Sequence, residues 1–193
     1  MTLRYTGWES LAPLTGRLEA ATIERPAVVA LDGFCASGKT TLAEEFRIRY
    51  GARIIHTDDF YLPAQMRSEE RYAEPGGTIQ YERLRAEVVD CLALPSLTHG
   101  RIRHADFSVG DYVTLPLAPV TVIEGAYASH PYLGDYATVR CFMLTDPEEQ
   151  RRRILSRNGP EKLAVFEARW IPYERRYEAA FGIREKADFI IET

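Results

Sequence analysis

The stretch Gly33-Phe34-Cys35-Ala36-Ser37-Gly38-Lys39-Thr40 decides how the rest of this sequence is interpreted. It follows an apolar run at positions 27–31 and leads into a helix-like segment at positions 41–46. A glycine-rich loop between a strand and a helix exposes successive backbone N–H groups, and the positive end of the helix dipole adds to them. The sequence therefore predicts a phosphate-binding loop for a nucleoside triphosphate.

Two side chains of this loop have separate expected tasks. Lys39 is expected to reach the β- and γ-phosphates, and the Thr40 hydroxyl to bind Mg²⁺. A guanine-reading Asn-Lys-x-Asp motif is absent from the chain, which excludes the usual GTPase pattern. We expect ATP with Mg²⁺, and GTP is the alternative donor, because the chain shows no motif that reads the donor's base. The residues expected to hold the nucleotide are Gly33, Ala36, Ser37, Gly38, Lys39, Thr40 and Thr41.

Composition narrows the class of protein. The 193 residues fit one domain (1–193), and 46% hydrophobic with 27% charged residues is ordinary for a globular protein. A net charge of −4 gives no electrostatic reason to bind nucleic acid or an anionic membrane. Three widely spaced cysteines are typical of reduced intracellular thiols, so we expect a cytoplasmic protein. The sequence is compatible with a homo-oligomer.

Apolar runs alternate with helix-like segments along the chain. This order favours an α/β P-loop NTPase fold, a three-layer sandwich with a mostly parallel five-stranded sheet and helices on both faces. An inserted hairpin is expected within about 95–118, with strands at 102–107 and 112–117, and an arginine-bearing lid at about 150–162. Strands are expected at 27–31, 53–57, 120–123, 139–144 and 188–191, and helices at 8–21, 39–50, 79–92, 147–157 and 161–181.

Acidic residues follow two of the predicted strands. Ligands of parallel sheets bind at the carboxyl ends of the strands, where Asp58, Asp59 and Glu124 are expected. An aspartate there can orient Mg²⁺ or accept a proton from a hydroxyl nucleophile. Capping or a solvated acid pair is the alternative for the aspartates, and a hydrogen-bonded structural role is the alternative for Glu124.

Arginines are dense at positions 151–157. On a helix Arg153 and Arg157 share one face, and arginines on a lid can neutralise charge on a transferring phosphoryl group. The alternative is a solvated basic face balanced by Glu148 and Glu149. The charged run at 174–178 is interpreted as such a solvated face.

The motifs at positions 30–42, 56–61 (His-Thr-Asp-Asp-Phe-Tyr) and 123–125 resemble the uridine kinase/phosphoribulokinase group of P-loop kinases. The resemblance runs from about Ala27 to the end of the chain. It implies that Asp58 is the base that activates an acceptor hydroxyl, and that Tyr61 lines the acceptor pocket.

The same resemblance implies roles on the donor side. Thr40 and Glu124 would hold Mg²⁺, Lys39 would bind the phosphates, and Arg153 and Arg157 would be the lid arginines.

The acceptor is less sharply defined than the donor. The Asp-His-Pro segment of uridine kinases has no clean counterpart, although Glu74 and Gln80 lie in the corresponding region. Arg103, His104 and Phe107 of the hairpin are the candidates for contacting a nucleobase. We expect a small-molecule hydroxyl acceptor, first a nucleoside such as uridine or cytidine. The alternatives are pantothenate, a sugar, a nucleoside monophosphate, or a regulatory module that binds the nucleotide without turnover.

Overall fold

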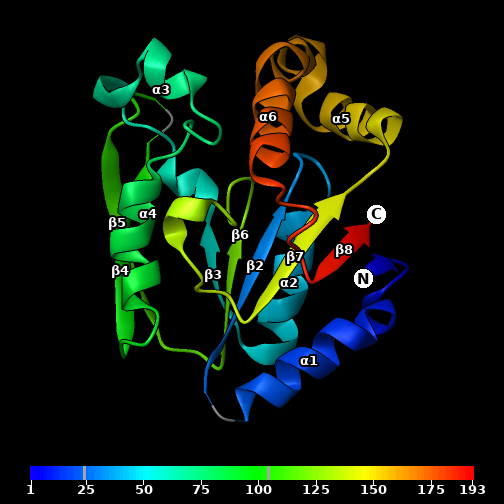
Figure 1. Ribbon diagram of the computed structural model, residues 1–193. Helices are drawn as coiled ribbons and strands as arrows, with labels where there is room; N and C mark the ends of the chain where they lie inside the picture. The colour runs from blue at the N-terminus through cyan, green and yellow to red at the C-terminus, as the bar shows by residue number, and fades with distance from the viewer. Residues whose placement is uncertain (24, 104) are drawn as a thin grey trace.

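A sheet of six parallel strands forms the centre of the computed structural model, which describes residues 1–23, 25–103 and 105–193 (Figure 1). The strand order is β1-β8-β7-β2-β6-β3. The strands are β1 (Thr2–Arg4), β2 (Ala27–Gly33), β3 (Arg53–His56), β6 (Val120–Glu124), β7 (Val139–Leu144) and β8 (Phe189–Glu192).

Helices cover both faces of this sheet (Figure 1). The main ones are α1 (Ala12–Thr22), α2 (Lys39–Tyr50), α4 (Tyr81–Glu87), α5 (Pro147–Val165) and α6 (Ile171–Phe181). Shorter segments are α3 (Glu69–Ala73), the 3₁₀ turns η1 (Trp8–Leu11), η2 (Thr57–Phe60), η3 (Ala64–Met66), η4 (Val89–Cys91) and η5 (Pro131–Leu133), and the π-helical η6 (Phe166–Trp170). None of the helices in the described part of the chain has the length and apolar character that crossing a membrane requires.

Two neighbouring interior strands, β2 and β6, are buried along their whole length. Their side chains alternate between two cores, as strand geometry requires. Val122 packs into the core formed with α1 and α2, whereas Ile123 packs into the core on the opposite face, with α4 and α6. Burial on both faces explains why these strands are continuous apolar runs in the sequence.

Most of the expected elements are confirmed, and the differences have local causes. The three-residue β1 has no clear sequence signal, because only Leu3 of this strand is buried. The hairpin lies within the expected range of about 95–118, but its strands begin earlier than predicted: β4 (Ser96–Ile102) pairs with β5 (Val109–Pro116). Gly100 interrupts the alternating pattern of β4, where the register shifts between His99 and Arg101.

Two expected helices also differ from the structure. The predicted helix at 79–92 divides into α4 and the 3₁₀ turn η4. The expected break near Gly159 is confirmed, because this glycine is non-helical (φ 81°, ψ 171°) and divides the range of α5 into two helical parts. The second part does not reach residue 181 as one α-helix, since η6 interrupts it. A π-helical turn then connects α5 to α6.

The sheet order brings the chemically important strand ends together. Glu124 at the end of β6 is paired with His56 on one side and with Leu31 on the other. The phosphate loop after β2, the Asp58 turn after β3 and the segment after β6 therefore meet at one edge of the sheet.

Gly33 cannot be replaced without moving β7. Its φ is +144°, and a Cβ atom on it would lie 2.1 Å from the Met143 carbonyl oxygen. We predict that Gly33→Ala lowers the free energy of unfolding by at least about 2 kcal/mol, through this clash and backbone strain. Chemical denaturation measures the change. Gly16→Ala is the matched control, because Gly16 has open space around it in α1, and it is expected to be neutral or stabilising by up to about 1 kcal/mol.

Candidate active site

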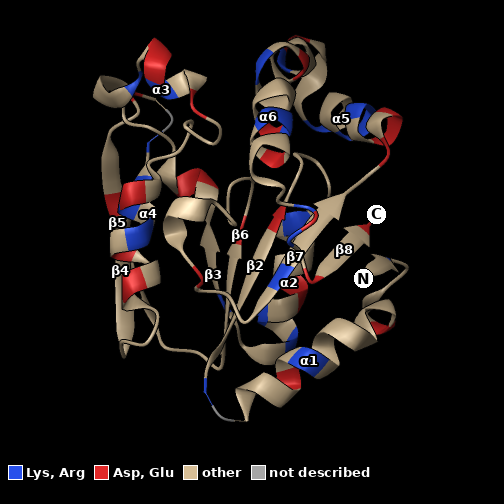
Figure 2. Ribbon diagram, viewed as in Figure 1, with Lys and Arg blue, Asp and Glu red and all other residues tan. Residues whose placement is uncertain are grey.

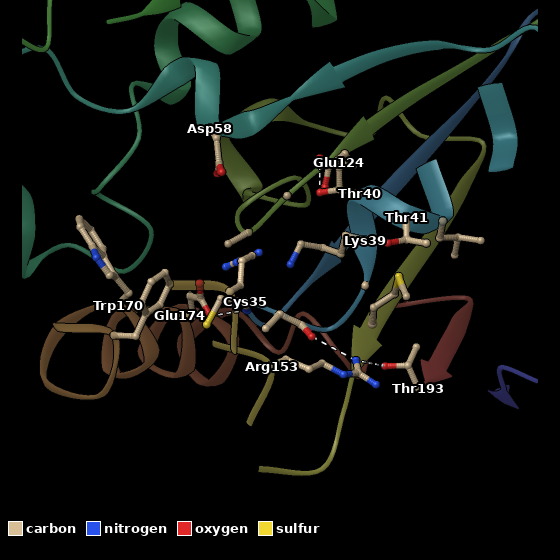
Figure 3. A pocket seen from close by; sticks show the side chains of 18 of the residues that line it. Cys35, Lys39, Thr40, Thr41, Asp58, Glu124, Arg153, Trp170, Glu174 and Thr193 are labelled. Carbon is tan, nitrogen blue, oxygen red and sulfur yellow. Dashed lines mark hydrogen bonds between the residues drawn. The ribbon is translucent and has the colours of Figure 1, made fainter. Parts of the chain in front are cut away.

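A cavity of about 500 Å³ lies at the edge of the sheet where these strand ends meet (Figure 3). Its walls come from the phosphate loop, η2, the segment after β6, α5, η6 and α6. These segments lie far apart in the sequence, and the parallel topology is what brings them together.

The phosphate loop forms one wall of the cavity and wraps around its own lysine. The Lys39 ammonium donates hydrogen bonds to the carbonyl oxygens of Gly33 (3.0 Å) and Phe34 (2.8 Å). These contacts hold the cation at the centre of the loop, where triphosphate oxygens are expected. Of the residues expected to hold the nucleotide, those lining the cavity are Ala36, Gly38, Lys39, Thr40 and Thr41. Gly33 begins the loop, and Ser37 is buried beneath it.

Thr40 and Glu124, the residues expected to hold Mg²⁺, are in direct contact. The Thr40 hydroxyl donates to Glu124 Oε1 over 3.1 Å, and His56 Nδ1 lies 2.6 Å from the same oxygen. This hydrogen bond to Glu124 raises the pKa of His56. A hydroxyl and a carboxylate facing a phosphate cradle suit Mg²⁺, which binds few protein oxygens and completes its shell with water and phosphate. The described residues contain no cluster of three or more His, Cys, Asp or Glu suited to a metal.

Asp58 projects into the cavity from η2 (Figure 3). Its side chain is exposed and lines the cavity. Desolvation by the protein around it, and after that the charge of Glu124, raises the pKa of the Asp58 carboxyl. Lys39 acts in the opposite direction. A carboxylate with a raised pKa is a better proton acceptor than an ordinary aspartate, as a general base must be.

The adjacent Asp59 faces away from this cavity. Its carboxylate lies 3.5 Å from Arg101 Nε and 3.9 Å from His99 Nδ1, both on β4. The two neighbouring acids therefore have different environments, and of the two only Asp58 lines the cavity.

The predicted lid arginines both line the cavity from α5. Arg153 donates to the Ala36 carbonyl oxygen (3.1 Å) and to Thr193 Oγ1 (3.0 Å), so it is tied to the phosphate loop. Arg157 is exposed on the next turn. Arg152 instead points to solvent and pairs with Glu149, one of the acidic residues at the start of α5 in Figure 2.

Only some of the predicted acceptor-binding residues lie in the cavity. Tyr61 lines the cavity next to Asp58. Arg103 pairs with Asp111 at the surface of the hairpin, and Phe107 packs beneath Arg67, so neither lines the cavity. His104 lies outside the described residues.

The two other candidates from the acceptor region are engaged elsewhere. Glu74 accepts a hydrogen bond from the Tyr81 hydroxyl, and Gln80 accepts one from Arg83.

Sequence reasoning missed Glu174, which is buried in the cavity wall. The expectation of a solvated face at 174–178 is wrong at Glu174 and Tyr177, because α6 packs both against the site. A signal is present in the sequence: Phe166, Trp170, Glu174 and Tyr177 follow one another at helical spacings of four, four and three residues.

Glu174 contacts the phosphate loop directly. Its Oε2 accepts a hydrogen bond from the Cys35 N–H over 2.8 Å. Burial raises the pKa of Glu174 to about 7, although Lys39 and the Cys35 N–H act against this rise. Burial and the neighbouring Glu174 also raise the pKa of the Cys35 thiol, so Cys35 is a protonated, packed side chain.

Asp32 fixes α6 against the phosphate loop. Its buried carboxylate accepts hydrogen bonds from the backbone N–H of Gly33, Tyr127 and Ser129 and from the Tyr177 hydroxyl. Tyr177 lies three residues after Glu174, so this contact also sets the position of Glu174.

We predict that Tyr177→Phe lowers the free energy of unfolding by about 1.5–3 kcal/mol, because it leaves one oxygen of a buried carboxylate short of a donor. Denaturant unfolding measures this change. Tyr173→Phe on the same helix is the control, because Tyr173 packs through its ring against Tyr72 and Trp170. An equal loss in both variants would contradict the role given to the Asp32 contact.

The fold and the loop together define an α/β protein of the P-loop NTPase type. Solved structures with this fold align over most of the chain. A possible uridine kinase from Bacillus stearothermophilus aligns with a TM-score of 0.65 and 18% identity, over 93% of this chain and 99% of that one. A putative fructose transport system kinase from a Silicibacter species aligns with a TM-score of 0.71 and 20% identity, over 93% of this chain and 97% of that one.

A third alignment is with a D-glycerate 3-kinase from Cryptococcus neoformans, with a TM-score of 0.66, 14% identity and 96% of both chains covered. No protein-family model matches the sequence, and no curated protein matches it significantly. At these identities the likeness establishes the fold, so the resemblance to the uridine kinase group is borne out at the level of fold.

Proposed function

We propose that this protein is a phosphotransferase that moves the γ-phosphoryl group of ATP to a hydroxyl of a small molecule. The observation that carries the proposal is that one cavity contains Asp58, Lys39 and the Thr40–Glu124 pair. A base, a phosphate cradle and oxygen ligands for a metal are the parts that phosphoryl transfer needs. The kinases among the solved structures that share the fold support it.

These groups of the cavity have separate roles in the proposed reaction. The loop N–H groups and Lys39 bind the triphosphate. The Arg157 guanidinium stabilises the negative charge that develops on the transferred phosphoryl group. Asp58 accepts the proton of the acceptor hydroxyl as its oxygen bonds to the γ-phosphorus. The bond between that phosphorus and the bridging oxygen breaks, and ADP leaves with the electron pair. Mg²⁺, held by Thr40 and Glu124, would neutralise phosphate charge.

A nucleoside of the uridine or cytidine kind is the first candidate acceptor. One of the similar structures is that of a possible uridine kinase, and the acceptor motifs of this chain partly resemble that group. Pantothenate, a sugar or a nucleoside monophosphate are the alternatives. The small cavity favours a small-molecule acceptor over nucleic acid, and we propose that the enzyme works in the cytoplasm.

The second candidate function is a regulatory module that binds ATP without turnover. A pure sensor has no need for a base beside the phosphate loop, whereas Asp58 is exposed to the cavity with a raised pKa. This observation favours the enzyme.

We predict that Asp58→Asn lowers kcat by about 10²–10⁴-fold, because an amide cannot accept the hydroxyl proton. ADP release with Mg-ATP is measured against a panel of nucleosides, pantothenate, sugars and nucleoside monophosphates. Asp59→Asn is the matched control and keeps kcat, since Asp59 faces β4. Full turnover by Asp58→Asn with the best acceptor would show that the base is misassigned. Absence of turnover by the wild type with every acceptor would favour the sensor.

We also predict that Lys39→Ala lowers kcat by about 10²–10³-fold, because it removes a cation from the transferring phosphates. The fold is retained, since the hydrogen bonds of the Lys39 ammonium go to carbonyl oxygens of its own loop. Steady-state kinetics together with circular dichroism test this. A Lys39→Ala protein with wild-type kcat would contradict the role of the loop.

A further inference from the structure

Glu174 is a carboxylate in the cavity for which the proposed reaction has no task. It projects from α6, and one of its oxygens accepts the Cys35 N–H. Phosphoryl transfer places negative charge on the loop, so a carboxylate at this position is unfavourable for the donor alone. Its presence calls for another explanation.

The charged residues that line the cavity come from separate elements of the fold. The lining cations, Lys39, Arg153 and Arg157, come from the phosphate loop and α5. Figure 3 shows Asp58, Glu174 and Trp170 to the left of Lys39. None of the described residues that line the cavity from η2, η6 or α6 is a lysine or arginine.

Aromatic residues line the cavity together with Asp58 and Glu174. The ring centroids of Tyr61 and Trp170 lie 5.9 Å apart, and Phe166 also lines the cavity. Tyr61 and Tyr127 are close enough to feel the charge of Glu174, which contributes to the raised pKa of both phenols. Aromatic walls with carboxylate acceptors fit a ligand that has apolar faces and several hydroxyl or N–H donors.

The burial of Glu174 is only partly compensated in the free protein. Burial raises its pKa to about 7, above that of an ordinary glutamate, even with Lys39 and the Cys35 N–H nearby. A ligand that donates a hydrogen bond to this carboxylate stabilises its charged form, whereas an anionic ligand destabilises it. The residue can therefore select between ligands by charge.

We propose that Glu174 determines acceptor specificity: it receives a hydrogen bond from an uncharged, polyhydroxylated acceptor and repels acceptors that carry a carboxylate or phosphate. This inference rests on the proposed phosphotransferase function. Nucleosides and neutral sugars then remain as candidate acceptors, whereas pantothenate and nucleoside monophosphates are excluded by their negative charge. Glu174 acts beside Asp58, which takes the proton from the hydroxyl.

The test compares wild type, Glu174→Gln and Glu178→Gln with two panels of acceptors. The uncharged panel contains uridine, cytidine and neutral hexoses, and the anionic panel contains pantothenate, D-glycerate and nucleoside monophosphates. Glu178 is on the same helix, pairs with Arg184 at 3.7 Å and does not line the cavity, so its change is chemically matched.

We expect the wild type to use an uncharged acceptor with kcat/KM at least about tenfold above any anionic one, since one like-charge contact of this kind is worth about 1.4 kcal/mol or more. Glu174→Gln raises KM for the best uncharged acceptor. It also reduces the preference over anionic acceptors by about tenfold or more. Glu178→Gln leaves both quantities unchanged. Melting temperature and ATP affinity are measured for each variant, because a purely structural role would change these and leave the preference intact.

Two results would overturn the inference while leaving the proposed function in place. One is a wild-type enzyme that uses an anionic acceptor as well as an uncharged one. The other is an unchanged preference in a folded Glu174→Gln protein that still binds ATP. Absence of transfer to every acceptor in both panels is a different outcome, because it contradicts the phosphotransferase function itself and the inference with it.

Discussion

The buried carboxylate of Asp32 is the interaction on which the rest of the site depends. A buried charge is costly unless hydrogen bonds compensate it, and four donors converge on this one. Even so, desolvation raises the pKa of Asp32 above its usual value. The donors come from the start of the phosphate loop, from the segment after β6 and from Tyr177 on α6. Three walls of the cavity are thus fixed to one side chain at the end of β2.

The close approach of strand ends completes this arrangement. Gly125 has φ +134°, and a Cβ atom there would lie 1.9 Å from the Thr57 hydroxyl oxygen. The turns after β3 and β6 can therefore pack together only with glycine at this position. This contact places Asp58 and Glu124 in one cavity, where each affects the charge of the other. The geometry of the candidate site follows from backbone packing at the sheet edge as much as from the acidic residues themselves.

The sequence alone locates those parts of the candidate site that depend on a short stretch of chain. The phosphate loop and the strand-end acids follow from short patterns, because one strand–loop–helix unit or one buried strand determines each. The place of Glu174 cannot be read in this way, since the neighbouring Arg175 and Arg176 make the segment look solvated. Its burial depends on how α6 lies on the sheet, which the distant Asp32–Tyr177 contact determines. The start of the first hairpin strand, β4, is missed because the irregularity at Gly100 breaks the alternation that marks a strand.

Transfer of a phosphoryl group to a small hydroxyl compound can be followed by ³¹P NMR. The purified protein is incubated with Mg-ATP and a mixture of nucleosides, neutral sugars, pantothenate, D-glycerate and nucleoside monophosphates. We expect a new phosphomonoester resonance that grows in equal amount with ADP. Growth of inorganic phosphate alone, or unchanged ATP in a protein that binds it, would contradict the proposed phosphotransferase.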